Sequence, residues 1–411
     1  MNPASDQSRV PSPPPTSTSN SPVPVGGETS DAVIIGGGIS GVAAAYELAR
    51  SGASVTLVER QTLASMASGW TLAGVRQSGR HPAEVPLAMA AVRRWEGLAE
   101  ELGADTDYRQ EGNLRLARTP DEVPTIKQLV EEQRALGLPL DFLPDNQAVR
   151  AIAPALAETI LAASYCPTDG HASPTATVQA FAAAAKRYGA RLHLGTTVTG
   201  IDVADGRVRG VQTTGGPIAA PHVVIAAGVY SPTLCAMAGL NLPLQVRHTA
   251  AIQTVPLPPL LKQVLGVANG DFAGRQEVDG RLRFTGGSEP WQWPERPLKP
   301  DDVQPTPRQV AAVIPRGMAV LPALAEARIS RVWGGLLDVT ADALPVIERV
   351  AEPDGLVITA GFSGHGFCLG PITGEIIREL VLDGHSSLPL EPFQLRRFAR
   401  PLTAAEAALH G

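Results

Sequence analysis

The sequence has few cysteines, few aromatic residues and no excess of basic charge. Its 411 residues include three cysteines and 4% aromatics, and the net charge is −6. Because no basic excess exists to neutralise phosphates, a nucleic-acid partner is not expected. Cysteines that are few, odd in number and without a CxxC pair indicate a reducing compartment, so we predict a cytoplasmic protein. No uncharged apolar run reaches the roughly 18 residues of a membrane-spanning helix, so no transmembrane segment is expected.

Glycine and proline, in contrast, are plentiful. The 41 glycines and 37 prolines, with 44% hydrophobic residues, favour a loop-rich α/β protein of two or three domains. Residues 1–30 differ from the rest, because six prolines fall within residues 11–24. Such a segment buries too little apolar surface to order itself, so we predict a disordered tail, with a partner-docking tail as the alternative. No histidine, cysteine and carboxylate spacing indicates a metal site.

Residues 31–60 have the pattern of a dinucleotide-binding unit. A predicted strand at 32–35 runs into a GxGxxG motif formed by Gly36, Gly38 and Gly41. The glycines permit a tight turn, close approach of a pyrophosphate and close packing of the helix that follows. A second strand ends at Glu59, where an acid can accept hydrogen bonds from a ribose. This motif alone does not distinguish FAD from NAD.

Three later segments suggest that the ligand contains a flat ring system. Residues 67–76 are small and glycine-rich, so this loop can run close under a ring. Residues 223–225 read as a buried strand that returns to the main sheet and ends in Ala226-Ala227-Gly228. Residues 356–360 read as a strand that leads into a glycine-rich loop and a helix. The N-terminus of that helix can face negative charge developing on a ring.

A specific combination of motifs joins these segments. GGGISG at 36–41 and ASGWTLAGVRQSGR at 67–80 are followed by WGGLLDVTADALPVI at 333–347 and GFSGHGF at 361–367. Over about residues 31–385 the chain resembles the FAD-dependent oxidoreductases of the D-amino-acid oxidase type. It is similar above all to sarcosine oxidases, especially the beta subunits of multi-subunit enzymes, and to dye-linked proline and hydroxyproline dehydrogenases.

The resemblance implies an α/β fold with two domains. One is a discontinuous, Rossmann-like FAD-binding domain, and the other is an α+β substrate domain with a mainly antiparallel sheet. The FAD-binding domain would comprise residues 31–82, 150–242 and 330–411. The substrate domain would comprise residues 83–149 and 243–329.

The resemblance also implies that FAD is bound non-covalently. Some relatives attach the flavin through a histidine after the tryptophan of the second motif, but here Thr71 follows Trp70. Monomeric sarcosine oxidases use a cysteine at the position of Gly335. The expected cofactor-binding residues are Gly36, Gly38, Ile39, Ser40, Gly41, Glu59, Arg60, Ser68, Gly69, Ala73, Gly74, Val198, Ala227, Gly228, Gly361, Ser363, Gly364, His365 and Gly366.

Two further departures from the relatives bear on the chemistry. Monomeric sarcosine oxidases carry an oxygen-activating lysine directly after GFSGHGF, and Cys368 occupies that position here. A neutral thiol lacks the fixed positive charge that stabilises superoxide-like charge, which favours a dehydrogenase over an oxidase. Glycine oxidases place a substrate-binding arginine near Leu337, and its absence disfavours glycine as the substrate.

The catalytic candidates are residues that can hold a carboxylate or act beside the flavin. An arginine fork forms two parallel charge-assisted bonds with a carboxylate, and Arg76 and Arg275 are the candidates, with Arg80 in reserve. Each has a structural ion pair as its alternative. His365, between two glycines, is expected beside the flavin, and His248 resembles a histidine that relatives carry on a strand near it.

These features predict an FAD-dependent enzyme that oxidises the C–N bond of an amino acid or N-alkyl amino acid by hydride transfer. Sarcosine, proline and hydroxyproline are the model substrates. The electron acceptor would be a dye, a quinone or oxygen, and sister subunits are possible. The alternatives are a related enzyme that acts on another amine or a hydroxy acid, and a non-catalytic flavoprotein subunit of a larger complex.

Overall fold

The computed structural model describes residues 27–295, 298 and 300–399. Most of the predicted tail, residues 1–26, lies outside the described residues. Strand β1 (Glu28–Thr29) pairs in parallel with β12 (Ile218–Ala219). Regular structure therefore begins inside the segment 1–30 that the sequence predicted to be a disordered tail. Among the described residues, no helix is long and apolar enough to cross a bilayer.

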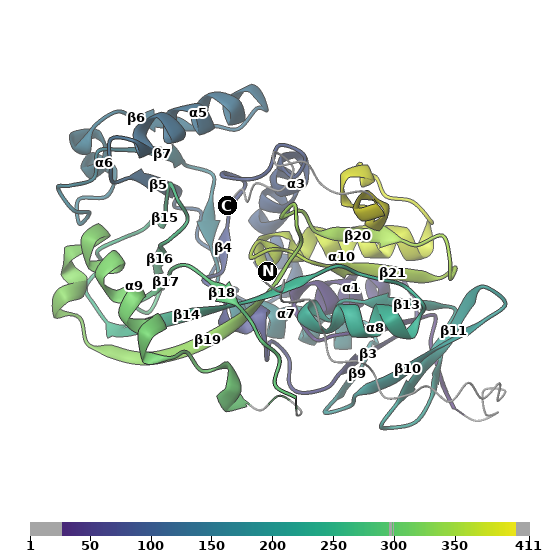
Figure 1. The fold of residues 1–411 in the computed structure, drawn as a ribbon. Helices are drawn as coiled ribbons and strands as arrows, with labels where there is room; N and C mark the ends of the chain where they lie inside the picture. The colour runs from purple at the N-terminus through teal and green to yellow at the C-terminus, as the bar shows by residue number, and fades with distance from the viewer. Residues whose placement is uncertain (1–26, 296–297, 299, 400–411) are drawn as a thin grey trace, which may run out of the picture.

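A six-stranded sheet includes β3, β9, β13, β20 and β21 (Figure 1) and also β2, the strand that precedes the glycine motif. Its order is β20-β21-β13-β2-β3-β9, and the pairs are parallel apart from the antiparallel pair β20–β21. The predicted strand that returns to the main sheet is confirmed as β13, which pairs with β2 on one side and β21 on the other. The strands are β2 (Ala32–Ile35), β3 (Val55–Glu59), β9 (Arg191–Leu194), β13 (His222–Ile225), β20 (Val346–Arg349) and β21 (Leu356–Ala360).

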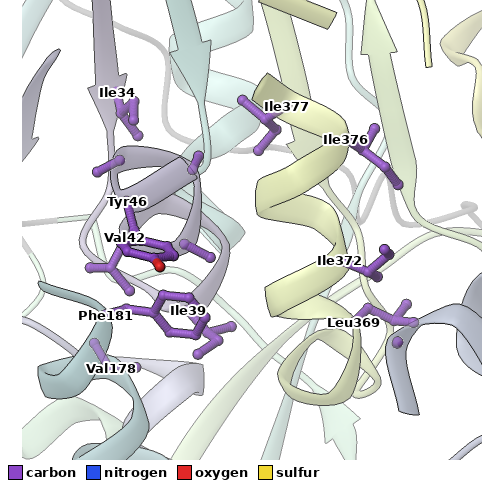
Figure 2. Packing of buried hydrophobic residues seen from close by; sticks show 14 of the residues in the cluster. Ile34, Ile39, Val42, Tyr46, Val178, Phe181, Leu369, Ile372, Ile376 and Ile377 are labelled. Carbon is purple, nitrogen blue, oxygen red and sulfur yellow. The ribbon is translucent and has the colours of Figure 1, made fainter. Parts of the chain in front are cut away.

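Three long helices pack beside this sheet. They are α1 (Ile39–Arg50), α7 (Pro174–Arg187) and α10 (Gly366–Leu382). Figure 2 shows their side chains gathered in one core, with Val42 of α1, Phe181 of α7 and Ile372 of α10 among them. The helices α1 and α10 approach closely, because a Cβ atom on Gly374 would lie 2.6 Å from the Cβ atom of Ala43. Small residues at this crossing therefore set the distance between the two helices.

A nine-stranded sheet forms the second half of the molecule. Its pairs are antiparallel apart from the parallel pair β15–β5, and β19 pairs with β14 off the main path. Asp279-Gly280 lies in the turn between β16 and β17, which pair as an antiparallel hairpin. The strands are β5 (Asn113–Ala117), β6 (Asp141–Leu143), β7 (Ala162–Cys166), β14 (Gln245–Pro256), β15 (Val264–Val267), β16 (Ala273–Gln276), β17 (Arg281–Thr285), β18 (Glu289–Pro290) and β19 (Ile329–Val339).

Smaller elements complete the fold. Strands β1 and β12 join a four-stranded sheet with β10 (Val198–Ala204) and β11 (Arg207–Thr213), and β4 (Gly74–Val75) pairs with β8 (Gly170–His171). The remaining α-helices are α2 (Ala67–Trp70), α3 (Val85–Glu96), α4 (Leu98–Leu102), α5 (Glu122–Ala135), α6 (Asn146–Ile152), α8 (Ser231–Met237) and α9 (Pro307–Val320). The short 3₁₀ helices are η1 (Gly228–Tyr230), η2 (Pro300–Val303), η3 (Pro322–Glu326), η4 (Glu391–Phe393) and η5 (Leu395–Ala399).

Three elements lie in a different half of the molecule from the one in which the predicted domain segments placed them. Helix α3 packs in the core of α1 and α10, although residues 83–149 were expected in the substrate domain. Strands β7 and β19 belong to the nine-stranded sheet, although residues 150–242 and 330–411 were expected in the FAD-binding domain. The fold class itself, with a mostly parallel sheet and a mainly antiparallel one, is as predicted.

Candidate active site

A cavity of about 700 Å³ lies between the two halves. Its walls include the turn after β2, the start of α10 and strands of the nine-stranded sheet. Sixteen residues predicted to serve the site line this cavity, and they come from segments far apart in the sequence. They are Gly36, Gly38, Ile39, Ser40, Glu59, Arg60, Ser68, Gly74, Arg76, Val198, Ala227, Gly228, Ser363, Gly364, His365 and Gly366.

The turn between β2 and α1 requires its glycines. Gly36 has φ +117°, and a Cβ atom there would lie 2.3 Å from the carbonyl oxygen of Ala226. A Cβ atom on Gly41 would lie 2.0 Å from the carbonyl oxygen of Gly36. Gly41 does not line the cavity, so its role is to let α1 start directly behind the turn. The N-terminus of α1, with its partial positive charge, therefore points into the cavity.

Acidic and aromatic groups lie beside this turn. The carboxylate of Glu59 accepts hydrogen bonds from the amides of Gly37 (2.7 Å) and Gln61 (2.8 Å). Arg60 lies over the ring of Tyr230 at 3.8 Å from its centroid and also donates to its hydroxyl. Tyr230 was not predicted, because only the folded chain brings residues 60 and 230 together.

The other end of the cavity holds the N-terminus of α10. His365 is the residue before this helix, and residues 364–367 line the cavity. Gly361 does not line it but allows the approach to the helix, with φ +72°. The carboxylate of Asp338 accepts a hydrogen bond from the Gly361 amide (2.6 Å), and burial raises the pKa of Asp338 to about 6. Sequence reasoning missed Asp338, although a carboxylate at the end of an apolar strand was a signal.

Comparison with known proteins assigns the family. A family model described as DAO, FAD dependent oxidoreductase, matches residues 31–380. The chain belongs to the DAO family. Glycine oxidase of Geobacillus kaustophilus (strain HTA426) is 30% identical over 375 residues, covering 89% of the present chain and 97% of the relative. Sarcosine oxidase subunit beta of Rhizobium meliloti (strain 1021) is 28% identical over 378 residues, covering 90% and 88%.

A solved structure agrees with this assignment. The crystal structure of L-proline dehydrogenase from P. horikoshii has a TM-score of 0.84 and 32% identity to this DAO-family chain, covering 91% of it and 98% of the solved chain. The predicted family and fold class are therefore confirmed.

The DAO-family chain is an FAD flavoprotein with a non-covalent cofactor. The residues present fit that group. The glycine turn and the N-terminus of α1 would hold the pyrophosphate, and Glu59 would bind the ribose hydroxyls. Thr71 and Gly335 line the cavity where relatives carry an attaching histidine or cysteine, and neither side chain can form such a bond.

Three arginines line the end of the cavity near His365. We call Arg76, Arg80 and Arg115 the arginine cluster. The Arg76 guanidinium has no hydrogen bond or ion pair with any other residue that the structure describes. Burial, and next the neighbouring Arg80, lower the pKa of Arg76 to about 10, so it remains charged at neutral pH. A charged guanidinium that faces a cavity and has no partner among the described residues is suited to bind a carboxylate.

A buried acid lies behind this cluster. Glu84 is 0% exposed, with its carboxylate 3.8 Å from Arg80 Nε and 3.4 Å from His365 Nδ1. Burial, and next Arg80, lower the pKa of His365 to about 4, so this imidazole is neutral at pH 7.

His248 does not reach the cavity. On β14 its neighbours Arg247 and Thr249 line the cavity, and alternate residues of a strand point to opposite faces. His248 Nε2 instead bonds the carbonyl oxygen of Val303 (2.8 Å), and its Nδ1 bonds Gln309 (2.9 Å). The predicted catalytic role is therefore not supported, and His248 anchors α9 and η2 to the sheet.

Arg275 also lies outside the cavity. Its guanidinium donates to the carbonyl oxygens of Leu72 and Ala172 and to Nδ1 of His171 (3.1 Å). Arg275 is on β16 of the nine-stranded sheet, so these bonds fasten the loop before β4 and the segment after β8 to that sheet. The alternative structural role is the one that the geometry supports. Gly69 and Ala73, in the same loop region, do not line the cavity either.

The Arg275–His171 bond predicts a loss of stability in mild acid. Burial, and next Arg275, lower the pKa of His171 to about 3. Below pH 6.5 the imidazole of His171 is protonated in the unfolded chain but stays neutral in the folded chain. The free energy of unfolding therefore falls as the pH drops from 6.5 towards 3. This single site should cost about 2 kcal/mol between pH 6.5 and 5.

Urea unfolding at both pH values measures the effect. His171→Gln keeps an acceptor for Arg275 and should reduce the pH-dependent loss by about that amount. The matched control is His385→Gln, because His385 is exposed. An unchanged pH dependence in His171→Gln would contradict the prediction.

Proposed function

We propose that this flavoprotein oxidises the C–N bond of an amino acid or N-alkyl amino acid whose carboxylate is bound by Arg76. The observation that carries the proposal is the Arg76 guanidinium, which has no partner among the described residues and lines the cavity together with His365 at the N-terminus of α10. The relatives named glycine oxidase, sarcosine oxidase subunit beta and L-proline dehydrogenase support this substrate class. Leu337 lines the cavity where glycine oxidases carry an arginine, which keeps glycine disfavoured within the proposal.

Different side chains around the cavity would have different roles in such a reaction. Flavin, when bound, supplies the hydride acceptor. Arg76 fixes the carboxylate and thereby orients the α-carbon. The substrate must react with an uncharged amine, and His365, whose pKa is lowered to about 4, stays neutral and would accept a hydrogen bond from that amine. Trp333, Phe272 and Leu337 form apolar walls that exclude water.

A substrate panel tests the proposal directly. The purified holoprotein is mixed without oxygen with D-, L- and N-methyl amino acids, and the flavin absorbance is followed. Bleaching by at least one amino acid is expected. Bleaching by amines that lack a carboxylate, or by hydroxy acids alone, would instead support the alternative same-fold enzyme. No bleaching by any compound would support the flavoprotein subunit.

We further propose that the enzyme is a dehydrogenase. Cys368 does not line the cavity; its thiol contacts the carbonyl oxygen of Arg76 (3.4 Å), and burial raises its pKa to about 11. The position that carries an oxygen-activating lysine in relatives is therefore neutral. Substrate-reduced protein should be reoxidised slowly by air and quickly by a dye or quinone. Hydrogen peroxide formed as fast as the dye is reduced would refute the dehydrogenase assignment.

A further inference from the structure

The lining of the cavity is strongly biased towards positive charge. Five arginines line it, namely Arg60, Arg76, Arg80, Arg115 and Arg247. Among the described residues that line it, the acidic side chains are Glu59 and Asp338, and both carboxylates are bound to backbone amides. Arg60 and Arg247 are also engaged, with Tyr230 and Ser288. The arginine cluster is the part of this charge that lies beside His365.

The cluster has more free donors than one carboxylate uses. The guanidinium of Arg76 has no hydrogen-bond partner among the described residues, and Arg80 Nη1 is buried without one there. Arg115 Nε and Nη2 donate to the carbonyl oxygens of Val267 (3.2 Å) and Ala268 (3.5 Å). No bond from Arg115 Nη1 to a described residue is found, so this nitrogen is available to a ligand. Two separate guanidinium groups, those of Arg76 and Arg115, can therefore donate into the cavity.

The acidic side chains nearest to the arginine cluster have contacts with other residues. Asp169 accepts hydrogen bonds from the Ser78 hydroxyl and from the amides of Gln77 (2.8 Å) and Ser78 (3.3 Å). The carboxylate of Glu84 lies 3.8 Å from Arg80 Nε and 3.4 Å from His365 Nδ1, without a hydrogen bond to either. In the part of the chain that the structure describes, neither carboxylate forms a hydrogen bond or ion pair with the guanidinium of Arg76 or Arg115.

Arg76 and Arg115 stand close together across Gly79. A Cβ atom on Gly79 would lie 2.7 Å from Arg115 Nη1 and 3.9 Å from Arg76 Nη1. The two nitrogens are therefore no farther apart than the sum of these distances. Gly79 has φ +69°, and any side chain there would displace Arg115. A separation within this bound allows two carboxylates joined by a short carbon chain to meet one guanidinium each.

The wall beside Arg115 suits the methylene groups of such a chain. Val264, Leu265 and Val267 of β15 line the cavity there, and β15 pairs with β5, which carries Arg115. Apolar contact along the chain and a charged donor at its end together favour an acidic side chain over an apolar or a basic one.

We infer that the preferred substrate is an amino acid with a second carboxylate, either on the side chain or on an N-alkyl group. Arg76 binds the carboxylate of the reacting α-carbon, and Arg115 binds the second one. The inference rests on the proposed function and narrows its substrate class.

Matched pairs of substrates test the inference. Anaerobic flavin bleaching by the holoprotein is compared for aspartate and glutamate against 2-aminobutyrate and norvaline, and for iminodiacetate against sarcosine, with both enantiomers where they exist. A second charge-assisted contact should raise the bleaching rate per concentration of the dicarboxylate at least about 10-fold over its partner. Equal or faster bleaching by the monocarboxylates would overturn the inference.

A variant of Arg115 tests whether this residue causes the preference for dicarboxylates. Arg115→Gln should lower the rate for the dicarboxylate about 10-fold more than the rate for its partner, with FAD content measured on the same sample. Arg109→Gln is the control, because Arg109 lies outside the cavity and its side chain is 39% exposed. Equal losses on both substrates in Arg115→Gln would refute the role of Arg115. If Arg115→Gln folds poorly, Arg115→Lys repeats the comparison.

Failure of the proposed function is distinguishable from failure of this inference. Succinate and butyrate cannot react as amines, and their binding is measured by the change in the flavin spectrum. If no amino acid bleaches the flavin but succinate binds about 10-fold tighter than butyrate, the amine oxidation is wrong and the two-carboxylate site stands. If amino acids bleach the flavin and succinate shows no advantage, the inference fails alone.

Discussion

Replacing Arg76 with lysine should lower kcat/KM for an amino-acid substrate about 10- to 150-fold, a loss of about 1.5–3 kcal/mol of transition-state stabilisation. The lysine keeps the positive charge but replaces a planar fork with a point charge, so one of two parallel bonds to the carboxylate is lost. The FAD content should stay full, because the glycine turn and Glu59 lie at the other end of the cavity.

Flavin content and steady-state kinetics on the same preparation decide the role of Arg76. Arg109→Lys is the matched control outside the cavity and should change neither quantity. If FAD occupancy falls while activity per bound flavin holds, Arg76 supports the cofactor and not the substrate. Normal occupancy with normal kinetics would remove Arg76 from the site.

Replacing Gly41 with alanine should abolish most FAD binding and lower the free energy of unfolding by about 3 kcal/mol. The added Cβ atom would lie 2.0 Å from the carbonyl oxygen of Gly36, so the turn or the start of α1 must move. Either movement takes the N-terminal amides of α1 away from the pyrophosphate position.

The ratio of flavin to protein absorbance and the urea midpoint measure these two losses. Gly97→Ala is the control, because a Cβ atom there meets nothing within 4 Å and φ is −102°. Full FAD occupancy in Gly41→Ala would show that the turn tolerates the displacement and that this glycine is not required.

Local spacing explains how much of the site could be predicted. Gly36, Gly41 and Glu59 fall within one strand–helix–strand unit, so their relation follows from the regular geometry of that unit. His248 and Arg275 were misplaced for a different reason. The face of a strand that meets a cavity depends on the register of the whole sheet, and a shift by one residue reverses it.

The residues that sequence reasoning missed depend on long-range packing. Arg115 and Glu84 acquire their positions from β5 and from the start of α3, far from the recognisable motifs. Their charge is unremarkable in the sequence, and it becomes informative only once burial leaves it without solvent. Apart from the placement of α3, β7 and β19, the domain boundaries stay predictions, as do the cytoplasmic location and the need for sister subunits.

The crossing of α1 and α10 has a consequence for the cofactor. Each helix begins at the cavity, one at the pyrophosphate end and the other at the end where His365 lies. Because Gly374 lets the two helices touch through their backbones and small side chains, one rigid contact fixes the span between those ends. The packing of the two helices thus sets the length of the ligand that fits between their N-termini. A bulky residue at this crossing, remote from every reacting atom, would alter where the flavin ring rests relative to the arginine cluster.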